Sequence, residues 1–419
     1  MSSMARSALH GDAGRTDLDD VVVVGGLRTP FSRFGGALKQ ISSIDLAAHA
    51  LRSVLDEFSI APDRVDEVFL GFTMPAEYAI DGSIPTRSAT IRAGLPDTVR
   101  SMTIDRACCS SATAIQLAAK SITLGEADIV LAGGADNMGR SSFMLSADQR
   151  WGHKRGALSM KDPIDSPGAD IGGKPVSVDA GEVALEYGVD RTQQDRWAVR
   201  SQERYFAALD AGFFDEELRG ITVAGPRGAE VLVDQDEEPR RGVTLEALGK
   251  LKTVYNSPTV TPGNAPGLST GACVVALARR SRAEELGLPI AATIRGWHSI
   301  ARNPREIAVA PAPAISGAVK KAGWSLSDVD LIEINEAFAA VPLVSALELA
   351  EGDRDLAEKI LDRTNVNGGA IAIGHPPGAS GARLALTAIR ELTRRSGGRA
   401  VIAICGGLGQ GDALAVSVP

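Results

Sequence analysis

The chain repeats one order of strands and helices in its first and last thirds, and this repeat limits its possible folds more than any other feature. The stretch LRSVLDEFSIAPDRVDEVFLG, Leu51–Gly71, resembles ISGAVKKAGWSLSDVDLIEIN, Ile315–Asn335. Each stretch has helical spacing, then a turn, then an aspartate (Asp66 or Asp330) at the entry to a hydrophobic strand. Similarity of this length predicts two halves of one duplicated fold.

Strand and helix patterns alternate within both halves. Apolar runs predict strands at 21–26, 66–71, 100–105, 129–132, 291–295, 329–334 and 399–404. Helical spacing is found at 43–58, 112–124, 311–322 and 379–394. This alternation predicts an α/β fold with a mostly parallel sheet covered by helices on both faces.

These patterns divide the chain into four predicted parts. We expect a flexible tail at 1–20, an N-terminal half at 21–138 with part of 258–290, and a C-terminal half at 291–419. The segment 139–257 between them is rich in Gly, Pro, Lys and Asp, with one amphipathic helix at Arg191–Ala211. A structureless loop of this length would be unusual in a compact domain, so we expect a subdomain or lid.

Composition argues against several classes of function. The net charge is −8, and no basic cluster is interleaved with aromatic residues, so nucleic acid is not an expected partner. No apolar run approaches the roughly 18–20 residues that span a bilayer. The four cysteines form no CxxC pair, which argues against a metal site and against a disulfide framework. A cytoplasmic location fits this cysteine usage best.

Cys108 stands between the predicted strand at 100–105 and the helix that follows it. The unpaired N–H groups at a helix N-terminus favour a thiolate and are expected to lower a cysteine pKa from about 8.5. The local sequence fits a buried, inert cysteine equally well, and both interpretations stay open. The adjacent Cys109 is expected to be a packing residue.

His375 lies in the loop of NGGAIAIGHPPGASGAR, crowded by glycines and prolines, before another helix. Cys108 follows Asp66 at nearly the spacing at which His375 follows Asp330. A duplicated fold would therefore bring Cys108 and His375 to matching loops of the two halves.

Three further segments carry candidate groups, each with a simpler alternative. Cys405 ends a strand in AICGGLGQG and could act as an acid–base group or be an inert core cysteine. Asn335, in EINEAFA, could hold a water or a carbonyl, or could cap a helix that has Glu336 in its first turn. The stretch TVTPGNAPGLSTGA at 259–272 suits a ligand-facing loop or an ordinary turn cluster.

Taken together, these motifs resemble the thiolase family over essentially all of 20–418. IDRACCSSATAIQLA, NEAFA, GGAIAIGHPPGASGAR and CGGLGQG are similar to four family blocks in the family's order. The resemblance implies duplicated βαβαβαββ halves that form a layered α/β/α/β/α core, with a large inserted loop domain. It also implies an acetyl-CoA C-acyltransferase that makes or cleaves 3-ketoacyl-CoA.

The resemblance assigns a role to each catalytic group. Cys108 resembles the acylated nucleophile, and His375 the base that activates it and a donor to one oxyanion hole. Asn335 resembles the residue that holds the water completing that hole. Cys405 resembles the acid–base group that moves the α-proton of acetyl-CoA. The N–H groups of Cys108 and Gly407 resemble the second oxyanion hole.

The resemblance also implies the ligands and the assembly. Acetyl-CoA, acyl-CoA and CoA are the expected substrates, with no cofactor or metal, and the expected state is a homodimer or homotetramer in fatty acid metabolism. Lys154, Arg155 and Lys161 in the insertion could screen CoA phosphates or could form a solvated loop. The expected substrate-binding residues are Gly263, Asn264, Ala265, Pro266, Ile307 and Phe338.

Several positions depart from the family pattern without removing a catalytic group. Asp105 replaces an Asn, Ser111 a Gly, Pro266 a Ser and Ile307 a Met. The stretch PVSVDAGEVA at 175–184 also lacks the His-Met-Gly of many biosynthetic relatives. Two alternatives are a decarboxylating ketosynthase-like condensing enzyme and a non-catalytic CoA-binding or scaffold subunit. Cys405 in its CGG loop favours the thiolase.

Overall fold

The computed structural model describes residues 21–165 and 174–419, so the predicted tail at 1–20 lies outside the described residues. The strands are β1 (Val21–Arg28), β2 (Ser32–Arg33), β3 (Glu67–Gly71), β4 (Arg100–Ile104), β5 (Ile129–Asn137), β6 (Met144–Leu145), β7 (Met160–Lys161), β8 (Ile221–Ala224), β9 (Glu230–Val233), β10 (Ser269–Arg279), β11 (Ala292–Ala301), β12 (Leu331–Ile334), β13 (Gly398–Gly406) and β14 (Gln410–Val418). The helices are α1 (Ser43–Glu57), α2 (Pro75–Asp81), α3 (Pro85–Arg92), α4 (Ser110–Thr123), α5 (Val176–Glu186), α6 (Arg191–Asp210), α7 (Leu245–Gly249), α8 (Arg280–Glu285), α9 (Pro311–Lys321), α10 (Ala340–Leu349), α11 (Arg354–Asp362), α12 (Ala370–Ile373) and α13 (Pro377–Arg394).

One ten-stranded sheet runs through both halves. Its order is β12-β13-β14-β11-β1-β10-β5-β3-β4, and β2 pairs with β10. The halves join where β1 pairs with β11 over two positions, Val22 with Thr293 and Val23 with Ala292. The expectation of a mostly parallel sheet was wrong. Among the described strands of this sheet, only β3–β4, β3–β5 and β12–β13 pair in parallel, because the long strands β10 and β14 return antiparallel through the middle of each half.

The predicted duplication is visible in matching hydrogen bonds. The carboxylate of Asp66 accepts N–H groups at the start of β5, from Asp128 and Ile129. The carboxylate of Asp330 accepts the N–H of Arg399 at the start of β13 in the same way. Each aspartate therefore connects the start of its own strand to the start of the neighbouring parallel strand. The two connections lie at equivalent places in the two halves.

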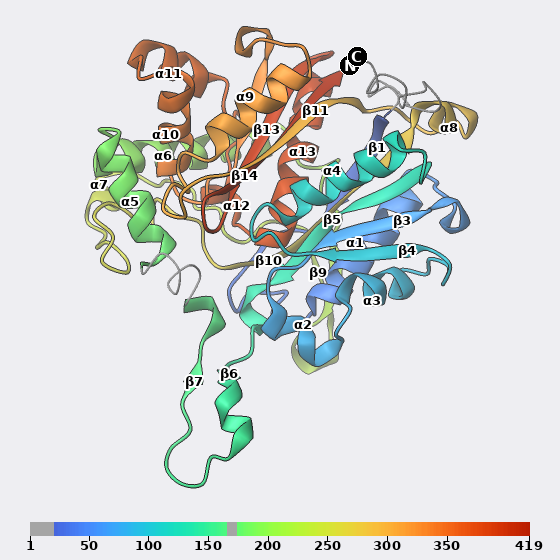
Figure 1. The fold of residues 1–419 in the computed structure, drawn as a ribbon, viewed down its shortest axis with the longest axis horizontal. Helices are drawn as coiled ribbons and strands as arrows, with labels where there is room; N and C mark the ends of the chain where they lie inside the picture. Colours follow the sequence, from blue (N-terminus) through green and yellow to red (C-terminus); the bar gives the residue numbers. More distant parts are fainter. Residues whose placement is uncertain (1–20, 166–173) are drawn as a thin grey trace, which may run out of the picture.

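Helices cover both faces of the two sheet halves (Figure 1). α4 and α13 pack against each other and against strands of both halves, forming the middle layer. α1 and α3 cover the outer face of the N-terminal half, and α9 and α10 cover that of the C-terminal half. Gly381 permits the close approach of the middle helices, since a Cβ there would lie 2.5 Å from the backbone N of Ala112. This is the layered α/β/α/β/α arrangement expected.

The inserted segment folds into several separate pieces. α5, α6 and α7 pack beside the C-terminal half, while β6 and β7 form an arm that projects away from the rest of the molecule (Figure 1). Apolar side chains exposed along this arm are Phe143, Met144, Leu145, Trp151, Leu158 and Met160. Within the described ranges, no helix is long and apolar enough to cross a membrane.

Candidate active site

Cys108 is presented by a tight turn between β4 and α4. Ala107 takes a left-handed conformation with φ of 50°, which its N–H stabilises by donating to the Asp105 carboxylate at 3.0 Å. The hydroxyl of Ser110 accepts the N–H of Arg106 at 2.9 Å and donates to the carbonyl of Ala107 at 2.6 Å. These bonds fix the backbone that presents the sulfur, while Cys108 as a whole residue is only partly buried.

His375 is held through its backbone and through its imidazole ring. Its backbone N–H donates to Ser269 Oγ at 2.9 Å, and its Nδ1 lies 2.6 Å from Ser380 Oγ. The Ser380 hydroxyl donates its single proton to the carbonyl of Pro376 at 2.8 Å. The hydrogen on the imidazole is therefore assigned to Nδ1, which leaves Nε2 as an acceptor.

The acceptor nitrogen of His375 lies close to two other predicted groups, the Cys108 thiol and the Asn335 amide. Nε2 lies 3.2 Å from Cys108 Sγ and 3.3 Å from Asn335 Nδ2. Asn335 is fully buried, and its Oδ1 has no hydrogen-bond partner among the described residues. The structure therefore brings Cys108, His375 and Asn335 together, as the repeat predicted for the first two.

The protonation of this pair differs from the sequence expectation. Burial, followed by the negative charges of Asp136 and Asp105, raises the pKa of Cys108 to about 12 instead of lowering it. Burial, and then the Arg383 cation, lowers the pKa of His375 to about 3. The N-terminus of α4 is outweighed because Cys108 loses solvent and faces two carboxylates. At neutral pH the resting pair is thus a thiol beside a neutral imidazole.

This protonation state makes a spectroscopic prediction. The difference in absorbance near 240 nm between the wild type and Cys108→Ser should show no thiolate band at pH 7, because the Cys108 pKa of about 12 keeps the thiol protonated. The three other cysteines cancel in the difference. A band that is present at pH 7 and persists down to pH 5 would instead indicate a stable thiolate–imidazolium pair.

Cys405 is the next-to-last residue of β13 and is followed by Gly406 and Gly407. Burial raises its pKa, and the charge of an ionised Cys108 raises the pKa further. The thiol of Cys405 has no exposed surface. It therefore suits a group that holds its proton until substrate fills the site.

Glu336 fixes the loop that carries Asn335. Its buried carboxylate accepts four hydrogen bonds of 2.8–3.0 Å, from Trp197, Ser201, Asn365 and the N–H of Ile371. α10 begins only at Ala340, so the alternative of a helix cap at Asn335 is wrong.

The predicted substrate-binding residues fall into three environments. Gly263, Ala265 and Pro266 line a cavity of about 150 Å³. The Asn264 amide is occupied by protein, donating to Asp195 and to the carbonyl of Thr259 and accepting from the N–H of Thr261. The Ile307 side chain is 3% exposed in the core of the C-terminal half, and Phe338 packs against that core.

The basic residues of the insertion lie apart from these groups. Lys154, Arg155 and Lys161 are exposed on the β6–β7 arm, which projects from the core (Figure 1). In the part of the chain that the structure describes, no group of His, Cys, Asp and Glu is arranged to hold a metal ion.

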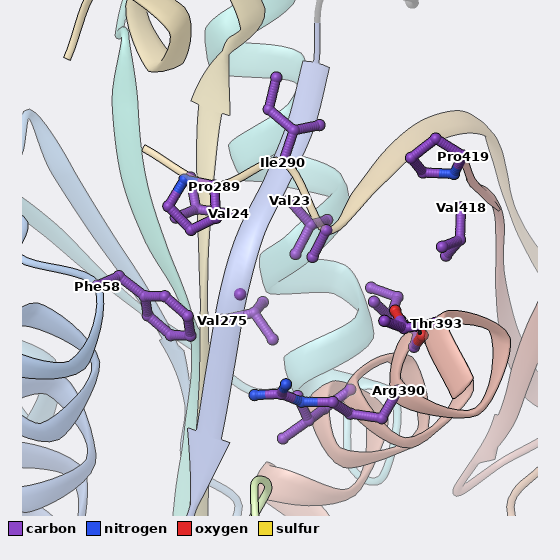
Figure 2. Close-up of a pocket in the computed structure, with 14 residues that line it drawn as sticks. Val23, Val24, Phe58, Val275, Pro289, Ile290, Arg390, Thr393, Val418 and Pro419 are labelled. Atoms are coloured by element: carbon purple, nitrogen blue, oxygen red, sulfur yellow. Dashed lines mark hydrogen bonds between the residues drawn. The ribbon is translucent and has the colours of Figure 1, made fainter. Parts of the chain in front are cut away.

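A second cavity, of about 240 Å³, lies beside the C-terminal turns of α13. Figure 2 shows Val23, Phe58 and Val275 around it, with Arg390 and Thr393 contributed by the last turns of α13. His375 precedes the first turn of this 18-residue helix, which is about 27 Å long. This cavity therefore contains none of the predicted catalytic groups.

Several positioning groups were missed by the sequence analysis. Ser380 and Ser269 fix His375, and the buried Asp136 accepts hydrogen bonds from Thr73 and from the N–H of Gly378. Burial raises the pKa of Asp136 to about 7. A carboxylate at the end of an otherwise apolar strand, as in AGGADN, was a usable signal for Asp136. The serines had no comparable signal.

Comparisons with known proteins agree along the whole chain. Residues 21–281 match the family described as "Thiolase, N-terminal domain", and residues 288–418 match "Thiolase, C-terminal domain". The chain is 38% identical to an acetyl-CoA acetyltransferase of Thiocystis violacea, over 95% of this chain and 99% of the relative. It is 39% identical to a cytosolic acetyl-CoA acetyltransferase of Mus musculus, over 95% and 98%.

Solved structures show the same fold. The crystal structure of the Bacillus anthracis acetyl-CoA acetyltransferase superposes with a TM-score of 0.89 at 36% identity, covering 96% of this chain and 99% of that one. Human mitochondrial 3-ketoacyl-CoA thiolase in complex with CoA gives a TM-score of 0.88 at 35% identity, covering 96% and 98%.

Proposed function

The chain belongs to the thiolase family, and from this premise we propose that it makes or cleaves 3-ketoacyl-CoA through a thioester on Cys108. The observation that carries this proposal is the contact of 3.2 Å between Cys108 Sγ and His375 Nε2, beside the buried amide of Asn335. Acyl-CoA, acetyl-CoA and CoA are the proposed substrates, and the chemistry requires no redox cofactor. Family membership favours an acyltransferase over both alternatives, the ketosynthase-like enzyme and the scaffold subunit.

The first half of thiolysis breaks the carbon–carbon bond. Cys108 gives its proton to His375 Nε2 as its sulfur attacks the 3-keto carbonyl, and the N–H groups of Cys108 and Gly407 stabilise the oxyanion. The bond between C2 and C3 then breaks and leaves the acyl group on sulfur. The electron pair departs as the enolate of acetyl-CoA, which takes a proton from Cys405. His375 and a water held by Asn335 stabilise this enolate.

The second half transfers the acyl group to CoA. The Cys405 thiolate first recovers its proton from the His375 imidazolium, and His375 then takes the thiol proton of CoA as the CoA sulfur attacks the thioester on Cys108. Cys108 leaves and recovers its proton from His375. Every proton is then back in place, and condensation follows the same path in reverse.

A neutral pair of Cys108 and His375 in the resting enzyme suits this order of reaction steps. Because the pKa of His375 is low and that of Cys108 is high, charge separates only as the new bond forms. The oxyanion donors then stabilise a charge that the resting state lacks, which is what lowers a barrier.

Initial-rate kinetics test the covalent route. Varying acetoacetyl-CoA at several CoA concentrations should give parallel double-reciprocal lines, because acetyl-CoA leaves before CoA binds. The same preparation should not turn over malonyl-CoA. Intersecting lines would argue against the acyl-enzyme, and decarboxylation of malonyl-CoA without acetyl-CoA would favour the ketosynthase-like alternative.

We further propose a homodimer or homotetramer that acts in the cytoplasm, within fatty acid metabolism. Two surfaces support assembly: β4, which ends the sheet and leaves Met102 52% exposed, and the β6–β7 arm with its exposed apolar residues. The loop Gly263–Pro266 is proposed to face CoA through Gly263, Ala265 and Pro266, while Asn264 shapes the loop. Phe338 and Ile307 are proposed to border the acyl group.

A further inference from the structure

The nucleophile turn lies directly against the turn that connects β13 and β14. A Cβ on Gly406 would lie 2.9 Å from Cys109 Sγ and 3.0 Å from the carbonyl oxygen of Arg106. The Cys109 thiol also donates to the carbonyl of Ile404 at 3.4 Å. The backbones that carry the N–H groups of Cys108 and Gly407 are therefore in contact, although they come from opposite halves of the duplicated fold.

The β13–β14 turn has a strained backbone. Leu408 and Gly409 are both left-handed, with φ of 64° and 72°, and this conformation is unfavourable for leucine. The only side-chain hydrogen bond to the turn itself, among the described residues, runs from Gln410 Nε2 to the carbonyl of Gly407 at 3.3 Å. The turn is thus held from β14, the strand that follows it, and by the backbone N–H of Arg302, which donates to the carbonyl of Gly409 at 2.9 Å.

The guanidinium of Arg106 connects this strand to the nucleophile turn. Its Nε donates to Gln410 Oε1 at 3.1 Å. Its terminal nitrogen reaches both carboxylate oxygens of Asp412, at 2.7 and 2.8 Å, and Thr113 Oγ1 at 2.9 Å. Asp412 is completely buried, whereas the Arg106 side chain is 27% exposed. One residue of the first half therefore contacts two alternate positions on the same face of β14.

We propose that Arg106 is a positioning residue that sets the separation of the Cys108 and Gly407 N–H groups. This inference rests on the proposed function, which assigns those two groups to one oxyanion hole. Both donors must lie about 2.7–3.1 Å from the same oxygen, so a small shift of either turn weakens the hole. Arg106 acts through Gln410 and Asp412, and its nitrogens are directed at protein partners.

Lysine should not replace Arg106, because a single ammonium lacks the planar fork that serves Gln410 and Asp412 together. The rate constant for acetylation of Cys108 by acetyl-CoA, measured by rapid quench and mass spectrometry, should fall about 100-fold in Arg106→Ala and about 30-fold in Arg106→Lys. The acetyl-CoA concentration at half-maximal rate should change less than threefold. Added guanidinium should restore part of the rate in Arg106→Ala.

Arg279→Ala is the matched control. Arg279 is a partly buried arginine that pairs with Asp128 at 2.7 Å, at the far end of β10. It should lose comparable thermal stability and keep the wild-type acetylation rate. If Arg106→Ala does not fold, Gln410→Ala takes its place. It removes only the side-chain contacts to Gly407 and Arg106, and it should slow acetylation about tenfold.

Acetylation within threefold of the wild type in Arg106→Ala, or in Gln410→Ala where the former is unfolded, would overturn the inference. An equal slowing in Arg279→Ala would do the same, since it would mark a general loss of stability. Failure of the proposed function looks different: Cys108→Ala would then still be acetylated at the active site.

Discussion

Replacing Cys108 with alanine is expected to lower the rate of acetoacetyl-CoA thiolysis by about four orders of magnitude or more. Loss of a catalytic nucleophile typically costs this much, because binding and oxyanion donors alone sustain only residual turnover. The reason here is geometric as well as chemical, since only Cys108 places a sulfur 3.2 Å from His375 Nε2 among the described residues. Incubation with labelled acetyl-CoA should give no covalent label in this variant.

The fold should survive this substitution. Cys108 is small and partly exposed, and removing its thiol should change the free energy of unfolding by at most about 1 kcal/mol. Cys273→Ala is the matched control, because Cys273 is a fully buried cysteine in β10 that has no proposed role. It should lose stability and keep both turnover and the acetyl label. Thiolysis at a near-wild-type rate in a folded Cys108→Ala protein would end the proposal.

The sequence predicted most of what places these groups together. Local patterns were sufficient for many of the elements, because strand runs and helical spacing reflect burial of one face at a time, but they did not predict β14 or the helices α2, α3 and α11. The repeat predicted that Cys108 and His375 would occupy matching loops, and Asp66 and Asp330 support the equivalence through similar contacts to the start of the neighbouring parallel strand. Duplication therefore supplied tertiary information that single motifs lack.

What the sequence could not predict depends on distance through space. The sequence did not predict that the sheet is mixed, because no local pattern indicates which neighbour a strand pairs with or in which direction. The pKa of Cys108 depends on burial and on Asp136, a residue from a different strand. The hydrogen bond between Arg106 and Asp412 joins positions 306 residues apart in the chain. Asn264 shows the same limit, because a polar residue in a glycine-rich loop suits a ligand and a loop-closing bond equally well, and the structure shows its amide in the loop-closing bonds.

Replacing Cys405 with alanine is expected to separate the two chemical steps. Carbon–carbon bond formation and cleavage should slow about 1,000-fold, within the range attributed to a positioned acid–base group. Exchange of labelled CoA into acetyl-CoA should continue at a rate close to that of the wild type. Exchange needs only Cys108 and His375, because the proton that Cys108 gives to His375 is returned to the departing CoA sulfur.

This separation follows from the environment of Cys405. Its burial raises the pKa of the thiol, so its thiolate is a stronger base, better matched to the weakly acidic α-proton of a thioester. Cys108→Ala should lose exchange and bond cleavage together, which makes it the comparison for Cys405→Ala. If Cys405→Ala lost exchange as severely as cleavage, Cys405 would be needed for the acyl transfer itself. If it lost neither, another group would move the α-proton, and the buried sulfur at the end of β13 would be a packing residue.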